Sequence, residues 1–137
     1  MRDNMNDLGL AGATVITQSD NIAIVSPIID TKGSDGLTFL IGAGTLADAD
    51  ATFTVLVEDG DDAALSDAAA VVDLELVGTE LLAGFQFDDD NAARKIGYIG
   101  NKRYARCTVT PINNAGSAPV AIIPVKGFLH LAPATNP

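Results

Sequence analysis

Carboxylates are the most numerous side chains in this sequence that could do chemistry. Fifteen of the 18 acidic residues lie between residues 30 and 90. Many of them stand in three short groups: Asp48/Asp50, Glu58–Asp62 and Asp88–Asp90. Calcium needs several oxygen ligands, and Glu58–Asp62 offers them, but without the twelve-residue spacing and final glutamate of a calcium loop. These groups are therefore expected to be solvated turns, with a calcium site at Glu58–Asp62 as the lesser alternative.

Nucleophilic and cofactor chemistry have little support in the sequence. Cys107 and His130 are the only cysteine and the only histidine, and a thiolate nucleophile needs a base beside it. Cys107 alternates with Ala105 and Val109, which predicts a small core residue. No glycine pattern of a phosphate-binding loop is present. We therefore expect no enzyme activity, no catalytic residue, no metal and no cofactor.

The basic residues are more informative, because five of the eight lie in one short stretch. They are Arg94, Lys95, Lys102, Arg103 and Arg106. They flank Gly100-Asn101-Lys102, which predicts the tip of a tight hairpin. In a chain of net charge −10, such a patch suits docking on an acidic partner or head-to-tail packing of copies. Alternatively, the cations neutralise the Asp88–Asp90 turn of the same subunit. Nucleic acid is not an expected partner, because the chain is acidic overall.

Short apolar runs separated by Gly, Asp, Asn and Pro predict the elements that position these residues. The expected strands are residues 22–29, 37–41, 51–58, 85–87, 95–99, 104–110 and 120–131. The alanine-rich residues 62–72 predict one short helix, with Ser66 and Asp67 as caps. With about seven or eight strands and no regular helices between them, the expected fold is all-β: an antiparallel, jelly-roll-like β-sandwich.

Length and composition predict one domain with two tails. The chain has 137 residues, of which 47% are hydrophobic, enough for one core. We expect an extended N-terminal arm over residues 1–12, the sandwich domain over 13–131 and a C-terminal tail over 132–137. No apolar run is long enough to span a membrane, and the N-terminus is unlike a signal peptide. A membrane partner is therefore not expected.

Three segments resemble a family of small proteins from tailed bacteriophages and prophages. They are residues 51–60 (ATFTVLVEDG), 88–111 and 125–133 (VKGFLHLAP), and the most specific motif is KIGYIGNKRY at 95–104. The resemblance covers roughly residues 36–133. It implies a structural virion protein, namely a decoration (cement) protein that is synthesised and assembled in the bacterial host cytoplasm and bound to the capsid surface. The implied partners are the major capsid protein and further copies of the chain, with a trimer favoured.

The contacts expected for such a protein lie on the basic stretch and the N-terminal arm. We predict that Arg94, Lys95, Asn101, Lys102, Arg103 and Arg106, with Arg2 and Asn4 of the arm, touch the partner. One alternative is a head-to-tail connector, neck or tail-associated ring protein. A second is a calcium-dependent surface or carbohydrate-binding module using Glu58–Asp62.

Overall fold

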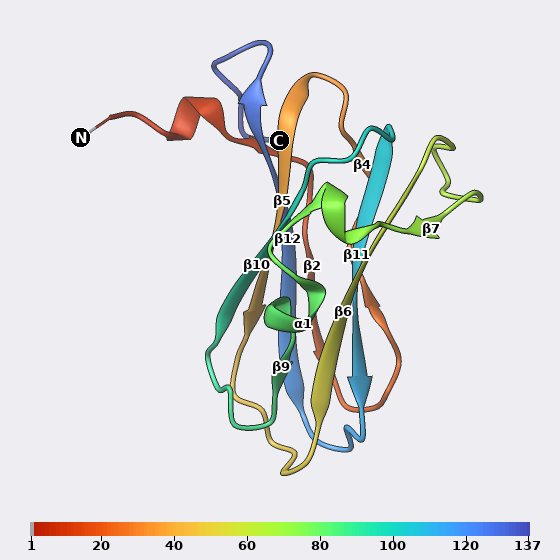
Figure 1. Ribbon diagram of the computed structural model, residues 1–137. Helices are drawn as coiled ribbons and strands as arrows, with labels where there is room; N and C mark the ends of the chain where they lie inside the picture. The colour runs from red at the N-terminus through yellow and green to blue at the C-terminus, as the bar shows by residue number, and fades with distance from the viewer. Residues whose placement is uncertain (1) are drawn as a thin grey trace.

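Two antiparallel sheets packed face to face form the molecule in the computed structural model, which describes residues 2–137 (Figure 1). Sheet A has six strands in the order β1–β12–β5–β10–β8, with β2 also paired to β12. Their bounds are β1 Gly9–Leu10, β2 Thr14–Gln18, β5 Ser34–Ala43, β8 Leu76–Val77, β10 Ala93–Tyr98 and β12 Ala118–Leu129. Strands from both ends of the chain therefore pair in sheet A with strands from its middle.

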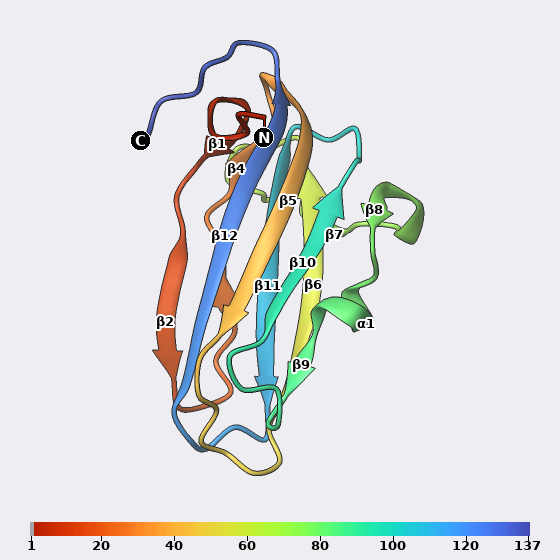
Figure 2. The ribbon, with the colours of Figure 1, turned by 90° about the vertical axis from the view of Figure 1, so that its left-hand side faces the viewer.

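Sheet B has the order β3–β11–β6–β7, with β4 paired to β11 and β9 paired to β6. Its strands are β3 Ile24–Val25, β4 Ile29–Asp30, β6 Thr52–Gly60, β7 Ala69–Ala70, β9 Phe85–Gln86 and β11 Tyr104–Ile112. Figure 2 shows β12, β5 and β10 in front of β11 and β6. The predicted jelly-roll-like β-sandwich is confirmed. The strand number exceeds the prediction because six of the twelve strands in residues 2–137 are pairings of only two residues each: β1, β3, β4, β7, β8 and β9.

Strict alternation along the long strands builds the core between the sheets. The inward side chains are Leu37, Phe39 and Ile41 on β5, Phe53, Val55 and Val57 on β6, Ala105, Cys107 and Val109 on β11, and Val120 and Ile122 on β12. Each fully buried large aliphatic or aromatic side chain stabilises the fold by about 1.5–3 kcal/mol. The predicted core position of Cys107 is confirmed, since the residue is 0% exposed.

The helix predicted over residues 62–72 is wrong. The segment consists of turns followed by the strand β7. The carboxylate of Asp62 accepts hydrogen bonds from the backbone N–H groups of Ala64 and Ser66, and that of Asp67 accepts from Asp61 and Asp62. These side chains compete for the backbone groups that a helix would use. The helical elements are instead η1 (Met5–Asp7), η2 (Asp73–Glu75) and the single turn α1 (Glu80–Ala83).

The hairpin predicted around Gly100-Asn101-Lys102 is also wrong. The flanking strands belong to different sheets, so this segment crosses from β10 in sheet A to β11 in sheet B. The loop folds against Tyr98, whose hydroxyl oxygen accepts a hydrogen bond from the N–H of Lys102 at 3.1 Å. Gly100 leaves room for the ring, because a Cβ there would lie 2.5 Å from the Tyr98 hydroxyl. Neither Gly100 nor Asn101 has a positive φ, so the segment is an open crossover and not the tight turn that these residue types predict.

The two predicted tails lie against each other at one end of the sandwich. Within the arm, β1 pairs with Val125 and Lys126 of β12, while residues 2–8 are exposed and project from the body (Figure 1). The N–H of Ala134 donates to the carbonyl of Asn6 at 3.0 Å. Residue 1 of the predicted arm lies outside the described residues. None of the helices in residues 2–137 has the length and apolar composition to cross a membrane.

Candidate functional site

The outward side of sheet A is almost free of charge, and we call it the apolar face. Because Leu37, Phe39 and Ile41 point inward, Thr38, Leu40 and Gly42 of β5 point outward, and the strand register extends this face across the sheet. Its members are Leu10, Val15, Thr17, Thr38, Leu40, Gly42, Val77, Ala93, Lys95, Gly97, Pro119, Ala121, Ile123 and Val125. Lys95 is the only charged residue among them. In a protein of net charge −10, this absence of acids is unusual.

Several side chains of the apolar face are well exposed. Val15 is 77% exposed, Val77 58%, Leu10 45% and Leu40 40%. A contiguous apolar surface of this kind typically marks an interaction site. The sequence indicates this surface through continuous apolar runs. The run VAIIPV at 120–125, for example, places apolar side chains on both faces of β12. Sequence reasoning missed this surface because it searched for charged and nucleophilic groups.

The outward side of sheet B has the opposite character. On β6 and β11 it presents threonines, the exposed Leu56 and Ile112, and a cross-strand ion pair in which Arg106 lies 3.4 Å from Glu58. The outward threonines are Thr52, Thr54, Thr108 and Thr110. This is the usual pattern of a solvated antiparallel sheet. The two outer faces of one sandwich therefore have different solvation.

A hollow of about 450 Å³ lies at one end of the apolar face, and we call it the outer groove. Gly36, Thr38 and Gly97 line it together with Val77 and Phe128. The Phe128 ring stands beside Gly36, where an added Cβ would come within 3.0 Å of it. Phe128 is 79% exposed, so its ring is accessible to a ligand or partner.

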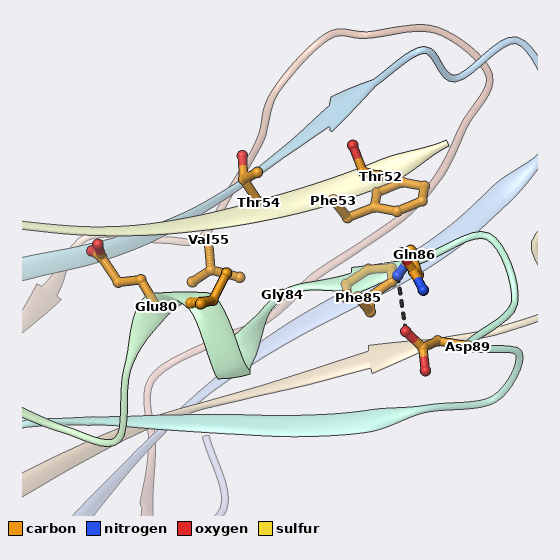
Figure 3. A pocket seen from close by; sticks show the side chains of 10 residues that line it. Thr52, Phe53, Thr54, Val55, Glu80, Gly84, Phe85, Gln86 and Asp89 are labelled. Atoms are coloured by element: carbon orange, nitrogen blue, oxygen red, sulfur yellow. Dashed lines mark hydrogen bonds between the residues drawn. The ribbon is translucent and has the colours of Figure 1, made fainter. Parts of the chain in front are cut away.

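A second cavity, of about 490 Å³, lies between β6 and the α1–β9 segment, and we call it the edge groove (Figure 3). Thr79 accepts a hydrogen bond from the N–H of Leu82 at 3.1 Å and so caps α1 at its start. Glu80, the first residue of α1, accepts a hydrogen bond from the N–H of Val57 at 2.8 Å through its Oε1. These contacts hold α1 beside the sheet edge.

The far end of the edge groove is built from aromatic and polar groups. Phe53 and Phe85 stack with ring centroids 4.6 Å apart, and Figure 3 shows the two rings over each other. Asp89 accepts a hydrogen bond from the N–H of Gln86 at 2.9 Å and forms an ion pair with Arg94 at 3.1 Å. Both oxygens of Asp89 are thus engaged, whereas only Oε1 of Glu80 has a partner among residues 2–137.

The predicted basic patch is divided among several surfaces. Four of its cations form ion pairs within the chain: Arg94 with Asp89 at 3.1 Å, Lys102 with Asp61 at 2.7 Å, Arg103 with Asp30 at 2.9 Å and Arg106 with Glu58 at 3.4 Å. Only the first pair involves the Asp88–Asp90 turn. Lys95 lies on the apolar face, Asn101 is exposed in the crossover loop, and Arg2 and Asn4 are exposed on the arm. Their role in partner contact remains a prediction.

The carboxylates of Glu58–Asp62 point to separate partners. Asp59 accepts a hydrogen bond from the hydroxyl of Tyr98, Asp61 from Lys102, and Asp62 from Ser66. Within residues 2–137, no group of three or more His, Cys, Asp or Glu side chains is placed to hold a metal ion. The geometry of this turn therefore gives the calcium alternative no support.

Cys107 and His130 have different surroundings. Burial raises the pKa of Cys107 to about 12, which keeps the thiol protonated at neutral pH. His130 is exposed and lies 2.7 Å from Asp35. Neither residue has the environment of an activated nucleophile and its base.

No sequence-family model matches the chain, and no curated protein matches it at a significant level. Among solved structures it is similar to a xylanase 10B fragment of Clostridium thermocellum with CBM22-1 and GH10 modules (TM-score 0.47, 10% identity), covering 97% of this chain but only 28% of that one. It is also similar to the CBM22-1 xylan-binding domain of Paenibacillus barcinonensis Xyn10C (0.44, 10%; 89% and 86% covered). A third is the N-terminal cellulose-binding domain of Cellulomonas fimi β-1,4-glucanase C (0.48, 11%; 88% and 82% covered). These likenesses concern the β-sandwich fold alone.

Proposed function

We propose that this protein is a non-catalytic structural module that attaches to a protein assembly through the apolar face of sheet A. The single observation that supports this is the outward side of a six-stranded sheet bearing one charge in a protein of net charge −10. Exposed apolar side chains gain free energy when a partner removes them from water. The resemblance of the 95–104 segment to phage proteins suggests the assembly, a phage head that this protein decorates.

The size of the apolar face favours attachment in several copies. Its four longer strands, about 4.8 Å apart and roughly 20 Å long, give an area on the order of 400 Å². That is about half of the ~800 Å² per partner found in stable pairwise complexes. One copy on its own should therefore bind weakly, and a homo-oligomer around a symmetry axis should bind tightly through avidity. The acidic loops keep free copies soluble.

The test is a charge placed on the apolar face. Leu40 of β5 is 40% exposed on the outside of sheet A, and Leu56 of β6 is 38% exposed on the outside of sheet B. The two leucines are matched in exposure, so Leu56→Glu is the control for Leu40→Glu. We expect Leu40→Glu to reduce occupancy on purified heads lacking the protein at least tenfold, and Leu56→Glu to leave it unchanged. Equal occupancy for both variants, at similar melting temperatures, contradicts the proposal.

Copy number per virion separates decoration from the connector alternative. A decoration protein is present in a number comparable to the major capsid protein, whereas a neck or tail ring contributes a single ring of copies. Quantitative mass spectrometry of purified virions measures the ratio directly. Absence from the particle contradicts both structural functions.

A carbohydrate-binding module is the second candidate, and the outer groove is the observation that favours it. An aromatic ring that is 79% exposed beside a glycine-lined hollow offers a stacking platform for a sugar. Titration with xylohexaose and cellohexaose tests this candidate, with Phe128→Ala as the variant expected to lose binding. If calorimetry detects no heat of binding and NMR detects no shift of the outer-groove amides at about 10 mM sugar, carbohydrate binding is excluded. The proposal of attachment through the apolar face is unaffected by that result.

A further inference from the structure

The outer edge of β6 has one residue whose backbone groups lack a partner. Backbone groups point alternately to the two sides of an antiparallel strand. Val57 uses the outer side, where its N–H donates to Glu80 at 2.8 Å and its carbonyl accepts from Val71 at 3.0 Å. Phe53 also uses this side, since it pairs with Phe85 of β9. Val55, midway between them, has no partner there in the part of the chain that the structure describes.

Short neighbouring strands cause this gap. β7 covers β6 only at Glu58 and Asp59, and β9 covers it only at Thr52 and Phe53. Between them the chain leaves sheet B, pairs with β10 of sheet A as β8 and turns through α1. It returns to sheet B at Gly84, where a Cβ would come within 2.8 Å of the Phe53 carbonyl. The place of one strand residue opposite Val55 is thus left open, and Val55 lines the edge groove of about 490 Å³ (Figure 3).

The chemistry of this opening matches a peptide backbone. An outward N–H and C=O on one edge residue pair with the C=O and N–H of one residue of an added antiparallel strand. Because these two groups line the open groove, a bound strand would exchange their contacts with water for two main-chain hydrogen bonds. Leu81 and Phe85 give the groove apolar walls, which suit a side chain of the peptide.

Charge selects the kind of peptide. Glu80 Oε1 is held by the N–H of Val57, and its other carboxylate oxygen has no hydrogen-bond partner among residues 2–137. The carboxylate of Glu80 also lacks an ion pair in the described chain, unlike that of Asp89. A lysine or arginine on the incoming strand complements this free oxygen.

We propose that the edge groove binds an extended peptide segment of a partner protein, which pairs with Val55 through two main-chain hydrogen bonds and places a basic side chain beside Glu80. This site lies on the edge of sheet B, away from the apolar face of sheet A. It therefore goes beyond the attachment proposed above and does not depend on it.

The first test uses the tripeptide acetyl-Val-Lys-Val-amide as the probe and NMR of the ¹⁵N-labelled full chain as the readout. We expect a saturable shift of the Val55 amide, because that N–H gains an acceptor. The control peptide carries a methyl group on the backbone nitrogen of its lysine, so it has no N–H to donate to the Val55 carbonyl. It should bind at least tenfold more weakly. No shift of Val55 at about 10 mM peptide, or equal binding of the methylated peptide, overturns the proposal.

The second test isolates the charge. Glu80→Gln keeps an oxygen to accept from the Val57 N–H and removes the negative charge. It should weaken binding of the lysine peptide about 3-fold to 10-fold, as expected for one partly exposed ion pair. Binding of the analogue in which norleucine replaces the lysine should not change. Glu75→Gln, outside the groove, is the matched control and should change neither affinity. If Glu80→Gln weakens both peptides equally, the basic-peptide assignment is wrong.

Discussion

The hydroxyl of Tyr98 donates a hydrogen bond to Asp59 at 2.8 Å and so connects β10 of sheet A with β6 of sheet B. Both residues are buried, with 3% of Tyr98 and 8% of Asp59 exposed. The same hydroxyl oxygen accepts from the N–H of Lys102 in the crossover loop. Burial, followed by the contact with Asp59, raises the pKa of Tyr98. One side chain thus links both sheets and the loop between them.

We expect Tyr98→Phe to lower the free energy of unfolding by about 1–3 kcal/mol, because a buried carboxylate and a backbone N–H each lose a partner. Urea denaturation monitored by circular dichroism measures the change. Tyr104→Phe is the control, since no hydrogen bond involves the Tyr104 hydroxyl in residues 2–137, and it should change stability by less than about 0.5 kcal/mol. Equal effects of the two substitutions contradict this role of the hydroxyl.

A methyl group should be tolerated at Gly42 and not at Gly84. At Gly84 a Cβ would lie 2.8 Å from the Phe53 carbonyl, whereas at Gly42 nothing lies within 4 Å. Gly84→Ala should destabilise the fold by about 1–3 kcal/mol through overpacking. Gly42→Ala should be neutral or stabilise it by up to about 1 kcal/mol, because it restricts the unfolded chain. Thermal melts of the two variants measure the contrast, and similar melting temperatures contradict it.

The Asp30–Arg103 ion pair should make stability depend on acid. The hydrogen bonds from Arg103 lower the pKa of Asp30 to about 2. Because the pKa of Asp30 is lower in the native state than its value near 3.9 in the unfolded chain, the ion pair stabilises the fold fully at a pH above 3.9. This stabilisation is lost as the pH falls towards 2. Asp30→Asn should therefore reduce stability at pH 7 by about 0.2–1 kcal/mol, a size typical of exposed pairs.

Urea denaturation of Asp30→Asn and the parent chain at pH 7 and pH 2 measures this dependence. The difference between the two proteins should shrink towards zero at the lower pH. Asp88→Asn is the control, because the Asp88 side chain makes no hydrogen bond or ion pair in the described chain. A difference that stays constant between the two pH values argues against the ion pair as its source.

Cys107 should react with a thiol reagent only when the protein unfolds. The residue is 0% exposed, and its pKa of about 12 keeps the thiolate rare at pH 8. A colorimetric disulfide reagent should therefore release almost no product from the native protein and one equivalent in urea. Rapid labelling without denaturant contradicts the buried position.

The sequence predicts the parts of the fold where side chains alternate. All but the first residue of the predicted strand 51–58 lie in β6, and residues 104–110 lie in β11, and both strands bury the expected faces. The two-residue strands β1, β7 and β8 are too short to show a period. The change of sheet after Tyr98 depends on packing at the end of the sandwich, which no local turn signal contains.

The candidate surfaces were harder to predict than the strands. Local sequence offers the Asp88–Asp90 turn as a partner for Arg94, but it does not show that the distant Asp61 and Asp30 pair with Lys102 and Arg103. The apolar face depends on the register of strands from both ends of the chain. The open edge at Val55 depends on where β7 and β9 stop. All three are properties of tertiary pairing.

Under the proposed attachment through sheet A, the difference between the two outer faces also decides which surface a coated particle would present to solvent. Molecules attached through sheet A turn the threonines and the Glu58–Arg106 pair of sheet B towards solvent. With a net charge of −10 on each copy, a complete coat gives the particle a hydrophilic, negatively charged exterior, and such particles repel one another. Under the proposed attachment, the module would therefore confer colloidal stability on a suspension of particles.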